Sequence, residues 1–251
     1  MLFNEYAQYY DLLYKDKDYD GEVKYIDALI TKYHNKAKKV LDLGCGTGRH
    51  AEILSQYGYN IHGVDMSREM LKKALQRAES NDRLAFTLSN IQKFDLKEEY
   101  DIVTALFHVM SYQVTDEAIK NVLLNVHKHL KKDGVFIFDC WYGPTVLTEK
   151  PEIRVKRLEN EKIRITRIAE PVMRENNNIV EVHYDVFVRN KKDDVIKEIQ
   201  ETHIMRYLFK KEIEKFVSEC GFSYIDGFEF MTGKSLSMST WGSCFVVRKE
   251  L

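Results

Sequence analysis

Three glycines, Gly44, Gly46 and Gly48, occupy alternate positions of the stretch LDLGCGTGRH. Glycine permits a tight backbone turn and removes the side chain that would hold a ligand away from the backbone. A carboxylate follows at Asp65, about 20 residues after Gly44, at the end of the apolar segment YNIHGVD. An acid at that spacing can accept hydrogen bonds from both hydroxyls of a ribose. Together the two features predict a binding site for a ligand that contains adenosine.

The glycine spacing also distinguishes between nucleotide ligands. A phosphate-binding P-loop has the pattern GxxxxGK[ST]; the segment GKS at 233–235 matches its end, but Phe228 stands at its first position. A dinucleotide fingerprint, GxGxxG, needs a glycine where Arg49 stands. The observed GxGxG therefore disfavours a bound pyrophosphate, although Asp65 by itself is compatible with a nicotinamide dinucleotide.

The elements that must position these residues alternate between apolar strands and amphipathic helices. Strand patterns occupy residues 38–44, 59–65, 84–89, 100–107, 135–141, 222–230 and 243–251, and helix patterns occupy 22–34, 49–58, 67–80, 116–134 and 210–221. This alternation indicates a parallel sheet covered on both faces. We therefore predict an α/β fold with a doubly wound, mostly parallel, seven-stranded Rossmann-like sheet. Gly44 then lies at the carboxyl end of the first strand, where such sheets bind ligands.

A different pattern begins after Pro151. Residues 154–170, 177–190 and 194–209 alternate polar and apolar side chains, with turn signals between these segments. We predict three antiparallel strands that form a small sheet, inserted at residues 152–208 into a single domain of residues 1–251. Residues 1–36, which are rich in tyrosine, are predicted to form a helical lid over the ligand.

Composition bears on the partners of the chain. The 38 basic and 39 acidic residues give a net charge of −1, so the sequence indicates neither nucleic acid nor an anionic membrane as a partner. No apolar stretch approaches the ~20 residues of a membrane span, and the N-terminus has no signal-peptide pattern. The four cysteines are scattered and predict neither a metal site nor disulfides. We expect a cytoplasmic protein that acts on a small molecule, and a homodimer is one assembly that the inserted sheet could support.

The order of the motifs resembles that of class I S-adenosylmethionine-dependent methyltransferases. VLDLGCGTG, GVDMS, YDIVTALF and LKKDGVFIFD follow one another over residues 40–139 as they do in that superfamily. The flanking segments YYDLLYKDKDY, CWYGP, IVEVHYDVF and ETHIMRYLFKKEIEKFVSECGF are similar to the N,N-dimethyltransferases of nucleotide-linked amino sugars. The resemblance implies S-adenosylmethionine as the cofactor, and methyl transfer to a small-molecule acceptor that carries an amine.

The same resemblance implies a set of cofactor contacts. The three glycines would pass under the methionine and ribose parts, Asp65 would bind the ribose hydroxyls, and Met66 would pack on the adenine. Asn90 stands where the family usually has an aspartate that accepts from the adenine amino group, and an amide oxygen can accept the same bond. The full implied set is Tyr10, Tyr19, Asp42, Gly44, Cys45, Gly46, Gly48, Asp65, Met66, Asn90, Ile91, Leu106 and Phe107.

Methyl transfer from a sulfonium depends mainly on holding the acceptor in line, because the cofactor carries its own activation. Polar and aromatic side chains near the predicted pocket could orient an amine or take its proton. The residues predicted for this role are Tyr14, His108, Tyr112, Trp141 and His183. Two departures from the amino-sugar enzymes stand out. Tyr112 replaces a histidine, and the loop MTGKSLSMSTW carries Lys234 but no arginine for a phosphate.

Two functions of other classes remain open from the sequence. The fold could serve as a binding module without catalysis, with the tyrosine-rich N-terminus and the inserted sheet as its interface. It could also belong to a nicotinamide-dependent oxidoreductase, although the glycine spacing and the lack of a Lys/Tyr or His/Asp catalytic pattern disfavour that function.

Overall fold

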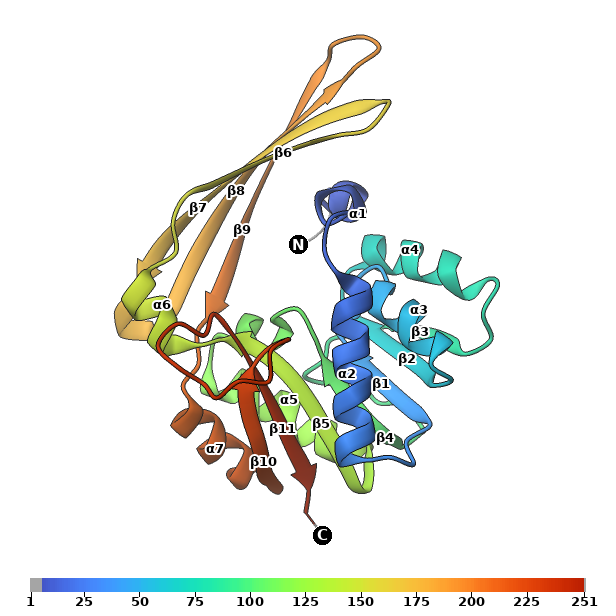
Figure 1. The fold of residues 1–251 in the computed structure, drawn as a ribbon. Coiled ribbons are helices and arrows are strands. Elements are labelled where there is room, and N and C mark those ends of the chain that lie inside the picture. The colour runs from blue at the N-terminus through green and yellow to red at the C-terminus, as the bar shows by residue number, and fades with distance from the viewer. Residues whose placement is uncertain (1–5, 251) are drawn as a thin grey trace.

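A seven-stranded sheet forms the centre of the protein in the computed structural model, which describes residues 6–250 (Figure 1). The predicted lid over residues 1–36 is thus described from Tyr6 onward, and residues 1–5 lie outside the described part. The strand order is β10-β11-β5-β4-β1-β2-β3. The bounds are β1 Lys39–Leu43, β2 Asn60–Asp65, β3 Leu84–Leu88, β4 Tyr100–Ala105, β5 Leu130–Trp141, β10 Phe222–Glu229 and β11 Gly242–Lys249.

Strands β1 to β5 run parallel to one another, and β11 is antiparallel to both β5 and β10. The strand order reverses between β1 and β4, so the loops that follow these two strands leave on opposite faces of the sheet. A crevice forms at such a point, outside the carboxyl ends of the strands. The prediction of a doubly wound, mostly parallel sheet is confirmed.

Helices cover both faces of this sheet. The helices of one face are α2 (Tyr19–Tyr33), α3 (Arg49–Gln56) and α4 (Arg68–Ala78), and those of the other are α5 (Asp116–His129) and α7 (Lys210–Glu219). Alternate residues of β1 supply the two cores: Val40 packs with α2 and α3, whereas Leu41 and Leu43 pack with α5 and α7. All three side chains are fully buried, and each burial contributes roughly 1.5–3 kcal/mol.

The start of helix α4 agrees with the sequence-based prediction, whereas the end of helix α5 does not. Helix α4 begins after Ser67, whose Oγ accepts the N–H of Met70 at 3.3 Å, which is the N-cap that the sequence predicts. Helix α5 ends at His129, and the prediction that it extends to Gly134 was wrong. Leu130 pairs with Tyr100, so residues 130–134 extend β5 instead.

The inserted sheet has four strands, and the prediction of three was wrong. They are β6 Arg154–Glu159, β7 Ile163–Arg174, β8 Ile179–Asn190 and β9 Ile196–Arg206, paired in that order and all antiparallel. The segment read as one strand turns at Asn160, whose Oδ1 accepts the N–H groups of Lys162 and Ile163 at 2.9 Å each. Short turns of this kind are typical of asparagine. The sheet rises from the end of β5, after helix α6 (Gly143–Glu149), and extends over the carboxyl edge of the large sheet (Figure 1).

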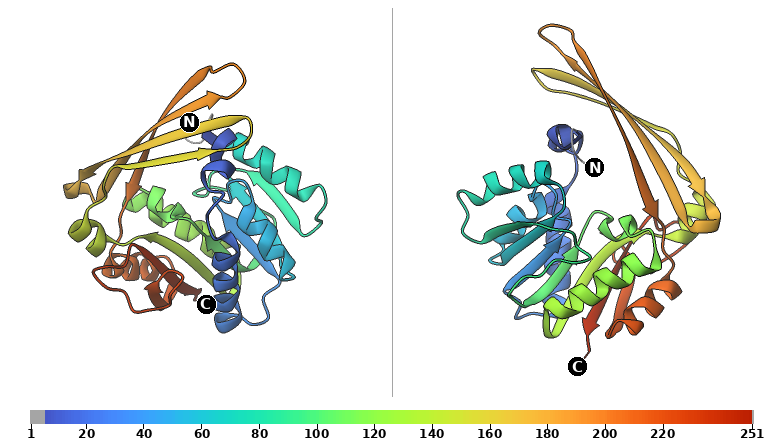
Figure 2. Two further views of the ribbon diagram at one scale, coloured as in Figure 1. Left: turned by 45° about the horizontal axis from the view of Figure 1, so that its top comes forward. Right: turned by 180° about the vertical axis from the view of Figure 1, so that it is seen from behind.

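The N-terminal segment lies under the inserted sheet (Figure 2). It comprises the 3₁₀ turn η1 (Tyr6–Tyr9) and helix α1 (Tyr10–Leu13). Tyr6 and Leu13 are fully buried in a cluster with Ile165, Val186 and Ile199 of the inserted sheet. Between residues 6 and 250, none of the helices combines the length and apolar character that crossing a membrane requires.

Candidate active site

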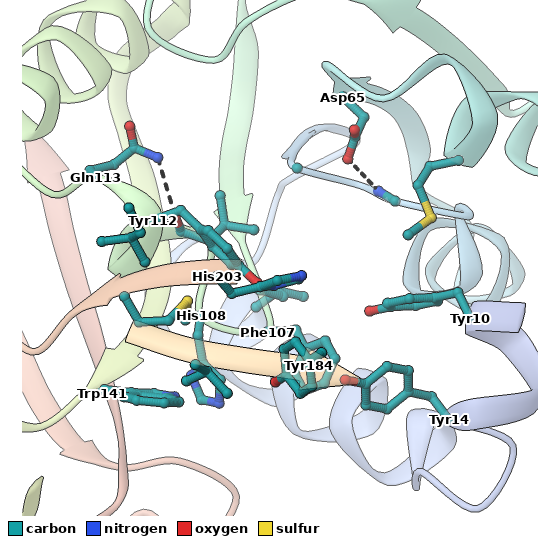
Figure 3. A pocket seen from close by; sticks show the side chains of 18 of the residues that line it. Tyr10, Tyr14, Asp65, Phe107, His108, Tyr112, Gln113, Trp141, Tyr184 and His203 are labelled. Atoms are coloured by element: carbon teal, nitrogen blue, oxygen red, sulfur yellow. Dashed lines mark hydrogen bonds between the residues drawn. The ribbon is translucent and has the colours of Figure 1, made fainter. Parts of the chain in front are cut away.

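A cavity of about 1010 Å³ opens beyond the carboxyl ends of β1, β2 and β4 and continues beneath the inserted sheet (Figure 3). Gly46 and Asp65 lie at one end, and Tyr184 and His203 belong to the sheet that covers the other. Small-molecule sites usually measure about 300–1,000 Å³. The volume is therefore sufficient for a nucleoside-sized ligand together with a second small molecule.

The three glycines of the first loop have different surroundings, although all have positive φ angles of 55–75°. A Cβ on Gly46 would meet no atom within 4 Å, and Gly46 lines the cavity. A Cβ on Gly44 would lie 2.5 Å from Cγ2 of Val109, so the 3₁₀ turn η2 (Val109–Tyr112) requires that glycine. A Cβ on Gly48 would lie 2.9 Å from Cζ of Phe86, outside the cavity. Gly46 is thus the glycine whose bare backbone adjoins space for a ligand.

Asp65 lies beside this bare backbone. Its Oδ2 accepts the N–H of Gly46 at 2.9 Å (dashed line at Asp65 in Figure 3). Its Oδ1 accepts the N–H of Ser67 at 2.7 Å. Burial raises the pKa of the carboxyl, whereas these backbone donors lower it. A carboxylate has about four lone-pair sites, and the backbone N–H of Met66 also acts on this carboxyl, so these bonds leave capacity for a ribose hydroxyl.

Asp42 lies under the loop and does not line the cavity. Its side chain is 2% exposed and accepts the hydroxyl of Thr104 at 2.9 Å. Burial raises the pKa of Asp42 to about 6. The position supports a structural part for Asp42, holding β1 to β4 below the glycine loop, more than the cofactor contact that the sequence predicts.

Most of the remaining predicted cofactor residues also line the cavity. Ile91 and Leu106 are buried apolar walls, while Met66 is 55% exposed at the rim. Asn90 uses Oδ1 to accept the N–H of Gln92 at 2.8 Å, which leaves a second lone pair on that oxygen. The predicted cofactor residues that line the cavity are Tyr10, Tyr19, Gly44, Cys45, Gly46, Asp65, Met66, Asn90, Ile91, Leu106 and Phe107.

His108, which follows β4, lies beside Asp139 of β5. Phe107 and His108 both have left-handed backbones, with φ of 64° and 66°, and strain of this type is concentrated at functional sites. The backbone N–H of His108 donates to Asp139, and its ring Nδ1 lies 2.8 Å from Oδ2 of the same carboxylate. Asp139 is 1% exposed and holds the backbone of His108, whose ring lines the cavity near Trp141 (Figure 3).

Tyr112 joins the large sheet to the inserted sheet. Its hydroxyl lies 2.8 Å from Nδ1 of His203, a residue of β9 that is 3% exposed. Nε2 of His203 lies 3.1 Å from Oε2 of Glu201. Burial raises the pKa of Tyr112 well above its ordinary value, so the phenol is neutral at physiological pH.

Aromatic rings of the N-terminal segment close the cavity from the side of the lid. Tyr14 packs edge-to-face on Phe107, with ring centroids 5.2 Å apart, and lies 4.6 Å from the ring of Tyr10. Nη1 of Arg167, on β7, donates to the hydroxyls of Tyr6 at 3.1 Å and Tyr14 at 3.2 Å. The lid is thus tied to the inserted sheet by a cation that also lines the cavity.

His183 is the predicted catalytic residue that does not line this cavity, whereas Tyr14, His108, Tyr112 and Trp141 do. Its Nδ1 lies 3.0 Å from Oγ1 of Thr202, and its side chain is 43% exposed. The neighbouring residues Val182, Tyr184 and Val186 face inward. Because side chains alternate along a strand, the apolar residues already indicate that His183 faces outward and that Tyr184 faces the cavity.

Sequence reasoning did not assign roles to several cavity residues. Asp139 lies near the carboxyl end of the strand predicted at 135–141 and could have been found as an acid close to a strand end. Arg154 and Arg167 had no local signal, because a charged residue in an alternating strand is usually solvated.

Across residues 6–250, no three His, Cys, Asp or Glu side chains are placed to hold a metal ion.

The residues at the Gly46 end fit the adenosyl part of S-adenosylmethionine. Gly46 provides bare backbone, Asp65 provides an acceptor for the ribose, and Ile91 provides an apolar wall for a flat base. Tyr10 and Phe107 lie further along the cavity and supply aromatic surface, to which a sulfonium is attracted by ~0.5–2 kcal/mol per contact.

Comparisons with known proteins agree with this fit. Residues 40–134 match the family model described as a methyltransferase domain. A relative from Geobacillus sp. (strain WCH70), named as a methyltransferase without a substrate, is 29% identical over 55% of this chain, which spans 57% of that relative. A dTDP-3-amino-3,6-dideoxy-alpha-D-glucopyranose N,N-dimethyltransferase of Streptomyces fradiae is 26% identical over 91% of this chain and 86% of its own length.

A solved structure shares the whole fold. The S-adenosylmethionine-dependent methyltransferase from Clostridium acetobutylicum ATCC 824 superposes with a TM-score of 0.84 at 23% identity, covering 100% of both chains. The strand order, the glycine loop with its acidic partner, and the matched domain agree with one another. Residues 40–134 therefore form a methyltransferase domain, and the chain is an S-adenosylmethionine-dependent methyltransferase with S-adenosylmethionine as its cofactor.

Proposed function

We propose that this methyltransferase acts on the amino group of a small molecule, and that the acceptor is an amino sugar. The observation that carries the proposal is the continuous cavity in which the Gly46–Asp65 site extends into a second chamber under the inserted sheet. An acceptor in that chamber lies against Tyr14, Trp141 and Tyr184, aromatic faces of the kind that pack on sugar rings. The Streptomyces fradiae relative, which spans most of the chain, is named for an amino-sugar substrate.

Two arginines support an acceptor with an anionic part. Arg154 and Arg167 both line the chamber from the inserted sheet. Nη1 of Arg167 bonds to two neutral phenols, so its positive charge is not neutralised by these partners. The loop at 231–241 lacks an arginine, and Lys234 in it does not line the cavity. In this chain the two arginines of the inserted sheet, rather than the loop at 231–241, therefore bind the phosphate of an activated sugar.

Catalysis in this site rests on position and on exclusion of water. S-adenosylmethionine, when bound, supplies an electrophilic methyl group and leaves as a neutral thioether. The chain must hold the acceptor nitrogen in line, and correct alignment can contribute roughly 7–11 kcal/mol to lowering the barrier. His108, held by Asp139, and Tyr112 are placed to orient the amine or receive its proton.

The N-terminal segment acts as the lid in this proposal. Tyr10, Tyr14 and Tyr19 line the cavity from the lid side, and Lys156 on β6 donates to the carbonyl of Leu13 at 2.6 Å. Closure of the lid excludes water, which strengthens every polar interaction inside the site. Lid opening then becomes the step by which acceptor and product exchange.

The test combines binding with product analysis. Calorimetry with S-adenosylhomocysteine should show one site per chain. Incubation with S-adenosylmethionine and a panel of free amino sugars, nucleotide-linked amino sugars and amino acids should yield N-methylated product from an amino sugar, detected by mass spectrometry. Matched sugars with hydroxyl in place of the amine serve as controls. Methylation of the hydroxyl sugars or of amino acids alone would contradict the proposed acceptor.

A further inference from the structure

A hydrogen-bonded chain of three side chains leads away from the acceptor chamber. The hydroxyl of Tyr112 lies 2.8 Å from Nδ1 of His203, and Nε2 of His203 lies 3.1 Å from Oε2 of Glu201. Tyr112 and His203 both line the cavity (Figure 3). The side chains of His203 and Glu201 are 4% and 9% exposed, so both polar groups are largely removed from water.

The chemistry of the three groups determines the direction of their hydrogen bonds. An ionised carboxylate can only accept, so Nε2 of His203 carries the proton that points to Glu201. Nδ1 of the neutral imidazole is then an acceptor, and the hydroxyl of Tyr112 donates to it. The phenol oxygen retains lone pairs that can accept a proton from a ligand in the chamber.

The surroundings of His203 hold its ring in this orientation. The ring of Tyr184 packs edge-on at 4.8 Å between centroids, and the ring of Tyr6 lies at 6.1 Å. Arg167 lies over the ring of Tyr184 at 5.1 Å and donates to the hydroxyl of Tyr6. Among residues 6–250, the titratable groups that the structure places around His203 include Glu201 on β9, Tyr112 on η2, Tyr184 on β8 and Tyr6 on η1, with Arg167 on β7 behind the last two. Glu201 is the carboxylate within hydrogen-bond distance of the imidazole.

We propose that Tyr112, His203 and Glu201 form a proton relay that converts the acceptor's ammonium group to the neutral amine. This inference rests on the proposed amine acceptor. One N–H bond of the ammonium breaks as the proton moves to the oxygen of Tyr112. The O–H bond of Tyr112 breaks at the same time, and its proton forms an N–H bond at Nδ1 of His203. The imidazolium that results is paired with Glu201, and it returns the proton to water after product leaves.

Within the relay, Tyr112 is the residue that contacts the acceptor. His203 and Glu201 are positioning residues that act through Tyr112. Such an arrangement does not require a phenolate as a stable species, which agrees with the raised pKa of Tyr112. The competing base is His108, which lies beside Asp139. The carboxylate of Asp139 also accepts the backbone N–H of His108. The two systems come from different elements, so substitutions can separate them.

Kinetics tests the catalytic part. Tyr112→Phe, His203→Gln and Glu201→Gln should each lower kcat, the first two by about 10²-fold, while the affinity for S-adenosylhomocysteine stays near that of the wild type. Matched controls carry the same substitutions outside the cavity: Tyr57→Phe, His34→Gln, and Glu198→Gln on the same strand. Thermal unfolding of each variant shows whether a loss of rate reflects a loss of folded protein.

The pH profile adds a signature that a structural role would not produce. His203 must be neutral to receive the proton, so the acid limb of kcat/KM reports its pKa. Without the charge of Glu201 the imidazolium is less stable, so Glu201→Gln should move the acid limb to lower pH while the maximum rate falls. Wild-type rates in Tyr112→Phe and His203→Gln would overturn the relay. So would an acid limb that persists in His203→Gln and disappears in His108→Asn, which would identify His108 as the base.

A measurement without acceptor distinguishes failure of the relay from failure of the proposed function. Nitrogen NMR of the protein with labelled histidine, assigned by His203→Gln, reports the tautomer and pKa of His203. The relay requires the tautomer with its proton on Nε2, and a lower pKa in Glu201→Gln. A proton on Nδ1, or a pKa unchanged by Glu201→Gln, would overturn the relay whatever the acceptor. If this spectrum is as expected but no amine is methylated, the proposed acceptor fails and so does the relay's part in transfer.

Discussion

The backbone N–H of Gly46 donates to Oδ2 of Asp65 at 2.9 Å, which ties the loop after β1 to the end of β2. The bond brings the bare backbone of the loop and the acid at the second strand end to the same side of the cavity. Asp65 therefore has two functions: it shapes the glycine loop, and its remaining lone pairs are available to the ribose of the cofactor.

The carboxylate of Asp65 should account for a large part of cofactor affinity. Hydrogen bonds to a charged group contribute about 1.5–3 kcal/mol each, so Asp65→Ala should weaken binding of S-adenosylhomocysteine at least about 10-fold. Asp65→Asn keeps one oxygen acceptor and should lose less. Calorimetry measures both, with Asp82→Ala in an exposed loop as the control. Equal affinity of Asp65→Ala and the wild type would show that Asp65 does not contact the cofactor.

Gly46 and Gly58 offer a comparison of strain with ligand contact. Both have positive φ, 55° and 94°, and a Cβ on either would meet no atom within 4 Å. Alanine at either position should destabilise the fold by about 1–2 kcal/mol, because a side chain is disfavoured in the left-handed region. Gly46 lines the cavity and Gly58 does not, so Gly46→Ala alone should lower cofactor affinity. Thermal unfolding and calorimetry on the two variants check this, and similar affinities would contradict it.

The buried carboxyl of Asp42 predicts a specific pH dependence of stability. Its pKa is about 6 in the folded protein because burial disfavours the charge. The unfolded chain therefore releases this proton at lower pH than the folded chain does, and the contribution of Asp42 to stability falls as pH rises from about 4 to about 6. The substitution Asp42→Asn keeps an acceptor for Thr104 and removes that titration.

Over this range the stability of Asp42→Asn relative to the wild type should therefore rise with pH, by about 2–3 kcal/mol in total. Urea unfolding at several pH values measures the difference, and Asp82→Asn on the surface controls for the loss of a carboxylate. A difference that stays constant between pH 4 and 7 would show that Asp42 titrates normally.

The link between the lid and the inserted sheet should control opening of the site. Arg167→Met removes the donor to Tyr6 and Tyr14, so backbone amides of α1 should exchange with solvent faster than in the wild type. Hydrogen exchange followed by mass spectrometry measures this, and S-adenosylhomocysteine should slow exchange in the wild type. Arg189→Met, on the far hairpin of the same sheet and paired with Asp194, is the matched control. Unchanged exchange in α1 of Arg167→Met would argue against the lid.

The local sequence pattern predicted most helices and strands correctly. The prediction was wrong where a segment pairs with a strand that is distant in the sequence. Ser67 was identifiable as a cap because its bond to Met70 spans three residues. The segment 130–134 continues the helical pattern of α5, yet it extends β5 because Leu130 pairs with Tyr100. The turn at Asn160 was missed because the strands on either side of it share the same alternation.

The sequence by itself determined the alternation of strands and helices, the glycine loop at the end of the first strand, and the acid that closes it. These features depend on residues within one strand–helix–strand unit, where spacing along the chain translates directly into spacing in the fold. Alternation along β8 is also a local property, but His183 was predicted for the site although that alternation places it outward and Tyr184 inward.

Only the tertiary structure decided which glycine has open space beside its backbone and which side chains meet across the cavity. Gly44 and Gly48 are required by Val109 and Phe86, neighbours that depend on how later elements pack. Tyr112 and His203 are 91 residues apart in the chain, and Arg167 and Tyr14 are 153 apart. Their contacts depend on the angle at which the inserted sheet covers the large sheet, and that angle is determined by the packing of many residues rather than by any short motif.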